Sequence, residues 1–499
     1  MHQDCTPYAE TSPYPPAKAR PTASNRNGGG TGFMSSAGRH RWTTLLLAVL
    51  AGGCVHTPPT KPQLAPIEAT TLGLDGAPAP AIAGAWWQAF KDPQLDRLAA
   101  GLADRNPGLE GALARMRAAQ AELAFSGSED RPQLALDAQE QRMRLSGEYI
   151  IPPPFGGSHR WTGEVVANLS WNLDFWGRQA DLIARSRHGA EAAALDAEAA
   201  RQALAGALVQ TYLQLALAWQ SADIAAADVE DRTTVLGLVE SRFDHGLENA
   251  AAVERAKALL AEARAGQASV VGTRDTLVHA VAALAGLGAD AHAGIHRPVL
   301  QPEAALPLPS TLPADLLARR PDILAARARI DAALAGREAA RAAFYPDINL
   351  VGLVGFQAIG LSNLFDSEAL TYGAGPAIHL PLFDAGRLRA QYAGMTAGLD
   401  MAVADYNEAV LSAVRQTADA LTRIQALADQ RTQQGAALAA AERAHALVKS
   451  RQSSGLASRI DVLAAASTVL AARERVDTLA AQSAIQRVAL LVCVGGGFH

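Results

Sequence analysis

Apolar and polar residues alternate along four short stretches of the chain, and this pattern predicts four β-strands. In the stretch WTGEVVANLSWNLD (161–174), every second residue is apolar or Gly, and most residues between them are polar. Residues 370–381 alternate in the same way, whereas 132–144 and 346–357 alternate less regularly. Strands of about ten residues with one apolar face fit a transmembrane barrel with a wet lumen. They fit half-buried soluble strands equally well.

Two much longer stretches follow the strand pairs and predict helices. Residues 177–244 and 386–452 contain no Pro and only scattered Gly. At 1.5 Å per residue, helices of about 65 residues would be roughly 100 Å long, which exceeds any compact domain. Their apolar positions recur with heptad-like spacing and are often Ala, which lets neighbouring helices approach closely, as in coiled coils. We therefore predict a mainly α-helical chain that also carries strand hairpins.

One short sequence occurs twice in the chain. SRFDHGL (241–247) matches SRQSSGL (450–456) in four of seven positions, at an offset of 209 residues from 241 to 450. Gly177-Arg178 matches Gly386-Arg387 at the same offset. Because the two matches share one register, we interpret them as parts of an internal repeat.

The repeat continues toward the N-terminus at an offset of 214 residues, which relates Arg105, Pro107 and Pro132 to Arg319, Pro321 and Pro346. A five-residue difference therefore lies between 132 and 177, where the loop IIPPPFGGSH (150–159) is longer than its counterpart. We predict two copies of one unit of helix, two strands, very long helix, turn and helix. The first repeat, with an N-terminal arm and a Pro-rich linker, spans 54–312, and the second spans 313–499.

Four strands per chain are too few for a membrane barrel, whose smallest bacterial examples have about eight. An open sheet edge is not viable in lipid, because no water is present to satisfy its backbone groups. A barrel must therefore be shared between chains. Two chains would supply eight strands and three chains twelve, and both counts fit the strand pattern.

The segment MSSAGRHRWTTLLLAVLAGGC (34–54) has a basic region, a short apolar run and small residues before Cys54. The run is too short to span a bilayer but is typical of a signal peptide. It resembles a bacterial lipoprotein signal, in which Cys54 becomes the lipidated N-terminus and Val55 favours sorting to the outer membrane. We expect residues 1–53 to be a disordered extension and this signal peptide, with translation starting at Met34. The alternative is a buried Cys after a chance apolar run.

Composition excludes several other functions. A net charge of −5 gives no electrostatic basis for binding nucleic acid. The three cysteines lie far apart, which excludes a disulfide framework and a Cys metal cluster. His292 and His296 have a spacing that metal sites use, but they lie in a Gly- and Pro-containing loop without a carboxylate pair. We find no nucleophile, zinc-protease or phosphate-binding motif, and we expect neither enzymatic activity nor a cofactor other than the covalent lipid on Cys54.

Several stretches together resemble the TolC-like outer-membrane factors of tripartite efflux pumps, in their OprM- or NodT-type lipoprotein branch. They occur in order along nearly all of 54–499: Cys54 after its signal, WWQAFKDPQLDRL (86–98), LDFWGR (173–178), LARRPDI (317–323), LFDAGR (382–387), the paired SR…GL turns and GGGF (495–498).

This resemblance implies a homotrimer in which twelve strands close an outer-membrane barrel that continues into a long periplasmic α-helical barrel. It implies a passive, lipid-anchored exit duct for drugs or other small molecules, opened when a periplasmic membrane-fusion adaptor and an inner-membrane pump dock. The alternative is a lipid-anchored periplasmic coiled-coil scaffold without a pore. A duct requires an apolar, lipid-facing side on all four strands, and a scaffold does not.

The resemblance also assigns roles to single residues. The two turns would be adaptor-docking tips formed by Arg242, Gly246, Leu247, Arg451, Gly455 and Leu456. The plainer interpretation is that each Gly only ends a helix. The strand-to-helix junctions would be formed by Gly177, Arg178, Gly386 and Arg387.

The family often places two acidic residues, three positions apart, around the closed periplasmic pore. Here Asp461 fits the first position and Ala464 stands at the second, while the first tip has Ala252 and Arg255 in those places. We therefore expect a gate with three Asp461 side chains, which relies on apolar packing and on pairing with Arg255 or other arginines. The alternative for Asp461 is an ordinary solvated helix residue.

Overall fold

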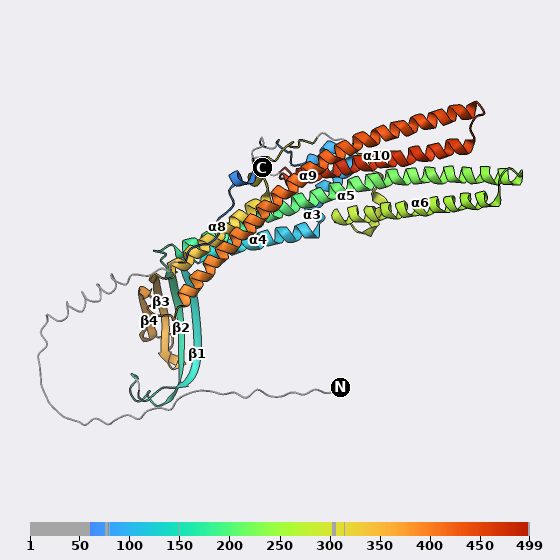
Figure 1. Ribbon diagram of the computed structural model, residues 1–499. Coiled ribbons are helices and arrows are strands. Elements are labelled where there is room, and N and C mark those ends of the chain that lie inside the picture. The colour runs from blue at the N-terminus through green and yellow to red at the C-terminus, as the bar shows by residue number, and fades with distance from the viewer. Residues whose placement is uncertain are drawn as a thin grey trace, which may run out of the picture. The chain divides into compact units, whose positions relative to one another are not determined.

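The structure, a computed structural model, describes residues 60–497 except 75–77, 79, 149, 302–305 and 314. These residues belong to one compact unit, Thr57–His499. Met34, the signal peptide, Cys54 and Phe498 lie outside the described residues. The main elements, shown in Figure 1, are α2 (Pro93–Ala100), α3 (Leu102–Arg105), α4 (Pro107–Ser128), β1 (Gln133–Arg144), β2 (His159–Asn172), α5 (Arg178–Asp244), α6 (Ala250–Leu284), α7 (Leu316–Arg319), α8 (Pro321–Ala342), β3 (Asp347–Ile359), β4 (Leu370–His379), α9 (Arg387–Ser453) and α10 (Arg459–Cys493).

The four strands lie where alternation predicts them, but their ends differ by up to two residues. β2 begins two residues earlier than expected because His159 and Arg160 pair with the end of β1. It also stops at Asn172, and the carboxylate of Asp174 instead accepts the Ala180 N–H at the start of α5. β4 stops at His379, two residues before Pro381, which has no N–H to donate to a ladder.

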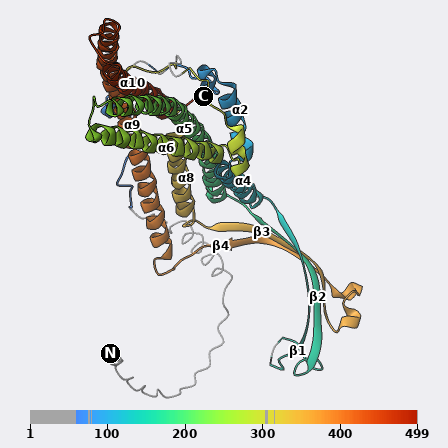
Figure 2. The same cartoon turned by 90° about the vertical axis from the view of Figure 1, so that its right-hand side faces the viewer.

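The strands form one antiparallel sheet in the order β1-β2-β3-β4, so that β2 of the first hairpin pairs with β3 of the second. Figure 2 shows both hairpin loops at the end of the sheet that is remote from the helices. Pro376 lies in β4, which pairs on one side only within the chain, and it has no N–H to donate to a ladder on either side.

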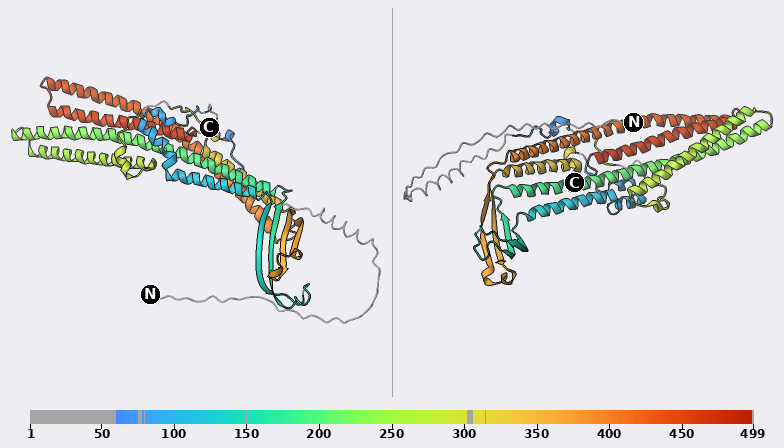
Figure 3. Two further views of the ribbon diagram at one scale, coloured as in Figure 1. Left: turned by 180° about the vertical axis from the view of Figure 1, so that it is seen from behind. Right: turned by 90° about the horizontal axis from the view of Figure 1, so that it is seen from below.

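Four helices lie side by side in the same order as the strands that they flank. α4 packs on α5, α5 on α8, and α8 on α9, as the right-hand view of Figure 3 shows. Beyond this row, α5 and α6 form one long hairpin, α9 and α10 form another, and α10 packs on α5. Among the described helices, only α10 is long and apolar enough to cross a membrane, but it packs along α9 within its hairpin.

The main hydrophobic core lies where the N-terminal segment meets the long helices. Trp86 and Phe90, in the 3-10 helix η3 (Trp86–Phe90), share a cluster of buried side chains with Tyr212, Val281 and Leu490. These three residues come from α5, α6 and α10, so the cluster ties three helices together. The WWQAF motif is therefore a packing element.

Each half of the chain contains an equivalent close contact between a glycine and a carbonyl oxygen. Gly286 follows α6 with φ 67°, and a Cβ there would lie 2.2 Å from the Arg105 carbonyl oxygen. Gly495 follows α10 with φ 106°, and a Cβ there would lie 2.4 Å from the Arg319 carbonyl oxygen. Only glycine fits both the positive φ and the close approach. The offsets of 209 and 214 residues relate one contact to the other.

The hairpins also share one register. Gln133 of β1 faces Ser170 of β2, and Asp347 of β3 faces His379 of β4. Adding 214 to the first pair member and 209 to the second converts one pair into the other. The five-residue difference therefore lies in the loop between β1 and β2, at 145–158.

Candidate functional site

One face of the sheet is apolar across all four strands, except at the end of β1 remote from the helices, where Glu140, Arg142 and Arg144 share this face. Cross-strand partners point to the same side of a sheet, so the register defines this face. From β1 to β4 it includes Leu134 and Leu136, Val165 and Leu169, Leu350 and Val354, and Tyr372 and Ile378. Most of these side chains are exposed, including those of β1, whose own sequence alternates poorly.

The opposite face carries polar side chains that bind one another between strands. The Asn168 amide donates to the Asp137 carboxylate at 2.8 Å, and the Asn172 amide donates to Asp347 at 2.8 Å. The Glu164 carboxylate accepts from amides on both neighbouring strands, Gln139 and Gln357. Such a face needs water or polar partners in front of it, while the apolar face requires a nonpolar environment.

Aromatic side chains gather where the strands meet the helices. Trp176 stacks on Tyr345 with ring centroids 4.9 Å apart and donates its indole N–H to the Pro346 carbonyl oxygen at 2.9 Å. Phe175 is exposed, and Phe383 in the second junction is 91% exposed. An aromatic belt of this kind marks the boundary between the hydrocarbon and water in membrane barrels. Sequence reasoning noted the LDFWGR motif but missed this belt.

The junction glycines start the long helices. Gly177 and Gly386 precede α5 and α9 with φ of 76° and 90°. Arg178 and Arg387 are the first residues of these helices. The Asp384 carboxylate accepts the Gly386 and Leu388 N–H groups at 3.0 and 2.8 Å, and Asp174 caps α5 in a similar way.

The two predicted tips have the same backbone geometry. In the first tip, the Leu247 N–H donates to the Arg242 carbonyl oxygen at 2.8 Å, and Gly246 has φ 72°. In the second tip, the Leu456 N–H donates to the Arg451 carbonyl oxygen at 2.8 Å, and Gly455 has φ 73°. This is a helix C-terminal cap in which Gly takes the left-handed conformation.

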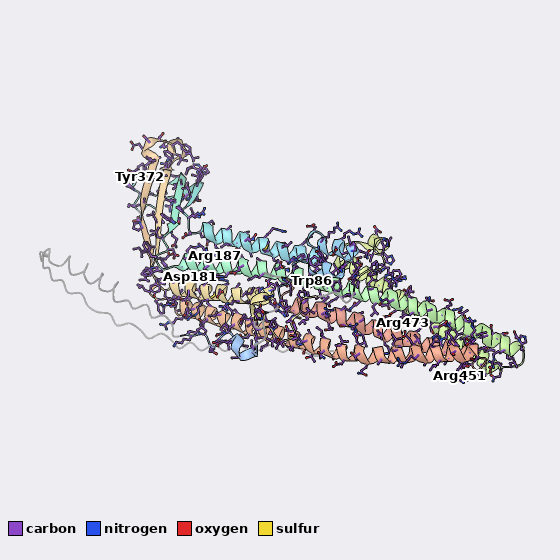
Figure 4. The ribbon with its side chains drawn as sticks, turned by 90° about the horizontal axis from the view of Figure 1, so that it is seen from above. Trp86, Asp181, Arg187, Tyr372, Arg451 and Arg473 are labelled. Atoms are coloured by element: carbon purple, nitrogen blue, oxygen red, sulfur yellow. The ribbon has the colours of Figure 1, made fainter. Side chains whose placement is uncertain are left out.

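Capping accounts for the glycines but not for the leucines. Leu247 is 68% exposed and Leu456 is 69% exposed, although leaving a leucine side chain in water is unfavourable relative to burying it. Figure 4 places Arg451 at the end of the helices remote from Tyr372 on the sheet. The two tips lie near each other, because Ile460 packs against the cluster of Val239, Val253 and Ala256.

The predicted gate residues occupy different environments. The Asp461 carboxylate accepts the Ser458 N–H and hydroxyl, each at 2.8 Å, and the Asp461 N–H donates to the Ser458 hydroxyl oxygen at 3.2 Å. This capping box starts α10 and lowers the pKa of Asp461, which the Arg451 and Arg242 guanidiniums lower further. Arg255 and Ala464 are exposed on α6 and α10. Among the described residues, the Asp461 carboxylate bonds to Ser458 and not to Arg255. The Ser-x-x-Asp spacing at 458–461 could have revealed this box from sequence alone.

A group of hydrogen-bonded polar side chains around Asp92 lies in the hydrophobic core, and sequence reasoning missed it. The buried Asp92 carboxylate accepts the Tyr212 hydroxyl at 2.9 Å and the N–H groups of Gln94 at 2.8 Å and Val299 at 2.8 Å. Burial raises the pKa of Tyr212 far above its usual range. These bonds join the N-terminal segment, α5 and the linker before the second half, so we interpret the group as structural.

Comparison with known proteins agrees with this architecture. A family model described as "Outer membrane efflux protein" matches residues 99–287 and 312–496. The chain is 35% identical to the fusaric acid resistance protein FusA of Burkholderia cepacia over 372 residues, 71% of this chain and 70% of that protein. It is 30% identical to the multidrug resistance outer membrane protein MdtP of Escherichia coli K12 over 422 residues, 83% and 86% of the two chains. The crystal structure of the outer membrane protein VceC from Vibrio cholerae superposes with a TM-score of 0.76 at 32% identity, covering 84% of this chain and 100% of that one.

Proposed function

The chain belongs to the outer membrane efflux protein family, and we propose that three copies close its four-stranded sheet into a twelve-stranded barrel. The observation that carries this proposal is the apolar face shared by all four strands, opposite a face of paired polar side chains. In a bilayer the first face meets lipid and the second lines a wet lumen.

The open sheet edges support a shared barrel. Within the described residues, β1 and β4 each pair on one side only, and unpaired backbone groups are not tolerated in lipid. Pairing β4 of one copy with β1 of the next would satisfy both edges. Two copies would supply eight strands and three copies twelve, and the resemblance to trimeric factors supports three.

Two structural repeats per chain complete the ring. The common hairpin register, the equivalent glycine contacts and the equal tips support this division. Three copies would then place twelve helices around a periplasmic tunnel, in the same order as the strands. The equal tips would recur six times around its mouth.

The assembly would act as a passive exit duct of a tripartite efflux system. The chain carries no nucleotide-binding motif, so an inner-membrane pump would supply the energy and a periplasmic adaptor would join pump and duct. The exposed leucines of the tips, Leu247 and Leu456, are apolar contacts suited to the adaptor. Drugs or similar small molecules are the proposed cargo, as the names of FusA and MdtP indicate for those relatives. No catalytic role or cofactor is proposed.

Two further parts of the proposal concern the ends of the molecule. Cys54 would carry the lipid that anchors the mature chain in the outer membrane. The resting gate would lie near Asp461, where its carboxylate is already bound to Ser458, so packing between neighbouring tips would contribute more to closure than an acidic ring.

The test is the size of the membrane-extracted protein in mild detergent, combined with palmitate labelling of wild type and Cys54→Ala. We expect a labelled species of about three chains for wild type and an unlabelled species of equal size for the variant. A water-soluble monomer after loss of the lipid would contradict the barrel and return the periplasmic scaffold as the better interpretation. Equal labelling of both proteins would contradict lipidation at Cys54.

A further inference from the structure

The internal repeat makes one junction of the proposed ring visible within a single chain. β2 and α5 of the first half lie beside β3 and α8 of the second half. In a closed ring, β4 and α9 of one copy would lie beside β1 and α4 of the next copy in the same way. The visible junction is therefore a template for the contact between copies, and this inference rests on the proposed shared barrel.

The offsets translate the strand register of the template. In the chain, Asn168 of β2 faces Leu353 of β3. Adding 209 to the first number and subtracting 214 from the second gives Ala377 of β4 facing Gln139 of β1. Val165 and Phe356 become Ala374 and Arg142 in the same way. Both translated pairs keep their side of the sheet, because 377 and 139 lie on the polar face and 374 and 142 on the apolar face.

An independent observation on the helices agrees with this translation. Asp196 of α5 forms an ion pair with Arg329 of α8. The same offsets convert these residues into Asp405 of α9 and Arg115 of α4. Position and sign of charge are both preserved, although the two helices lie at opposite ends of the row. Both side chains are exposed, and neither has an ion-pair partner within the described part of the chain.

The surface of α9 around Asp405 is exposed, whereas the corresponding surface of α5 around Asp196 is covered by a neighbouring helix. Ala192, one turn before Asp196, is 3% exposed in the row of helices, where α5 packs between α4 and α8. Its counterpart on α9 is Met401, which is 68% exposed. On the other side, the buried Ala325 of α8 corresponds to Gly111 of α4, where an added Cβ would meet no atom within 4 Å. The flank of α9 around Met401 and the flank of α4 around Gly111 are therefore both open within a single chain.

We propose that neighbouring copies of this chain pair β4 with β1 in the register Ala377–Gln139 and join α9 to α4 through an Asp405–Arg115 ion pair. The occupant of both open flanks is thus a second copy of the chain. The free side chains, their charges and the exposed Met401 all fit that partner.

Disulfide cross-linking in isolated outer membranes tests the register. Ala377→Cys is combined with Gln139→Cys in a Cys493→Ala background, and the single-cysteine chains serve as controls. A matched control combines Ala377→Cys with Gln141→Cys, two residues away on the same face. A second pair, Ala374→Cys with Arg142→Cys, tests the other face, because only one face carries the closely spaced, non-hydrogen-bonded pairs.

We expect oxidant-dependent covalent dimers and trimers from at least one proposed pair, and loss of these species in the shifted control. Cross-linking of the shifted control instead, with an intact oligomer in detergent, would overturn the register and leave the shared barrel standing. Absence of any oligomer in wild type would overturn the proposed barrel itself. Absence of cross-links in all pairs despite an intact oligomer would overturn the register.

Charge reversal tests the ion pair. Arg115→Asp and Asp405→Arg should each lower the temperature at which the oligomer dissociates in detergent, and the double variant should recover most of the loss. Arg117→Asp, also on an exposed position of α4, controls for a general effect of charge. A double variant no more stable than the singles would exclude the ion pair. An equal loss for Arg117→Asp would do the same.

Discussion

At the scale of single residues, the structure depends on glycines that lie directly against the backbone of another segment, where a side chain would not fit. Gly286 has positive φ and lies against the Arg105 carbonyl oxygen. We expect Gly286→Ala to destabilise the fold by at least about 1–2 kcal/mol, the cost of a left-handed Ala, with steric overlap adding to it. Thermal unfolding in detergent measures this loss.

Gly288 is the matched control for this substitution. It lies two residues further on, has φ −76°, and an added Cβ would meet no atom within 4 Å. Gly288→Ala should leave the unfolding temperature nearly unchanged. Equal effects of the two substitutions would show that the Arg105 contact is not the cause.

Asp461 offers a pH-dependent prediction. Its folded-state pKa is lowered by the Ser458 hydrogen bonds, so the carboxylate stabilises the start of α10 above the unfolded-state pKa. This contribution is lost as the pH falls through the folded-state pKa. Asp461→Ala should therefore reduce amide-exchange protection in the first turn of α10 at neutral pH and have little effect in acid.

Ser458→Ala removes the partner of Asp461 and provides the comparison. The two substitutions should not add, because each breaks the same capping box. A difference between wild type and Asp461→Ala that persists unchanged in acid would assign the effect to lost packing instead of charge.

At the scale of elements, the two faces of the sheet predict opposite responses to charge. Val354 lies on the apolar face, and its neighbour Leu353 lies on the polar face. An arginine facing lipid near the bilayer centre costs about 2–4 kcal/mol, whereas lumen substitutions cost much less. Val354→Arg should lower the yield and dissociation temperature of the membrane oligomer far more than Leu353→Arg. The reverse order would place the lipid on the other face.

The tips give a second prediction for elements. Replacing both Leu247 and Leu456 by Asp should abolish efflux, measured as drug accumulation in cells, without changing the amount or the size of the outer-membrane oligomer. Both side chains are exposed, so their loss costs little folding free energy. Unchanged efflux would exclude these leucines from adaptor docking, and loss of the oligomer would make them structural.

Elements were the level at which sequence was most informative. Alternation and helical length are local, and they placed each strand end within two residues and predicted the two very long helices. The repeated SR…GL turns located the tips for the same reason. The β2–β3 pairing and the contact of Gly495 with Arg319 join residues far apart in sequence, so no local pattern contained them. The capping box of Asp461 was visible in the sequence as the Ser-x-x-Asp spacing at 458–461 but was not predicted.

At the scale of the whole molecule, strands and helices follow one order, β1-β2-β3-β4 and α4-α5-α8-α9. Each strand therefore continues into, or follows from, the helix that holds the same place in the row. A change of strand register would displace the attached helices as well, which makes the sheet and the row of helices depend on each other.

The loop at 145–158 has a consequence for labelling the protein in living cells. The two hairpins of the molecule have the same register although this loop is five residues longer than its counterpart. Extra residues in this loop therefore leave the strand pairing unchanged. In the proposed orientation, the loop faces the medium. A peptide epitope inserted after Glu148 should leave drug export intact and be stained by antibody on unbroken cells, whereas the same epitope at the helical tips should stain only after the envelope is opened.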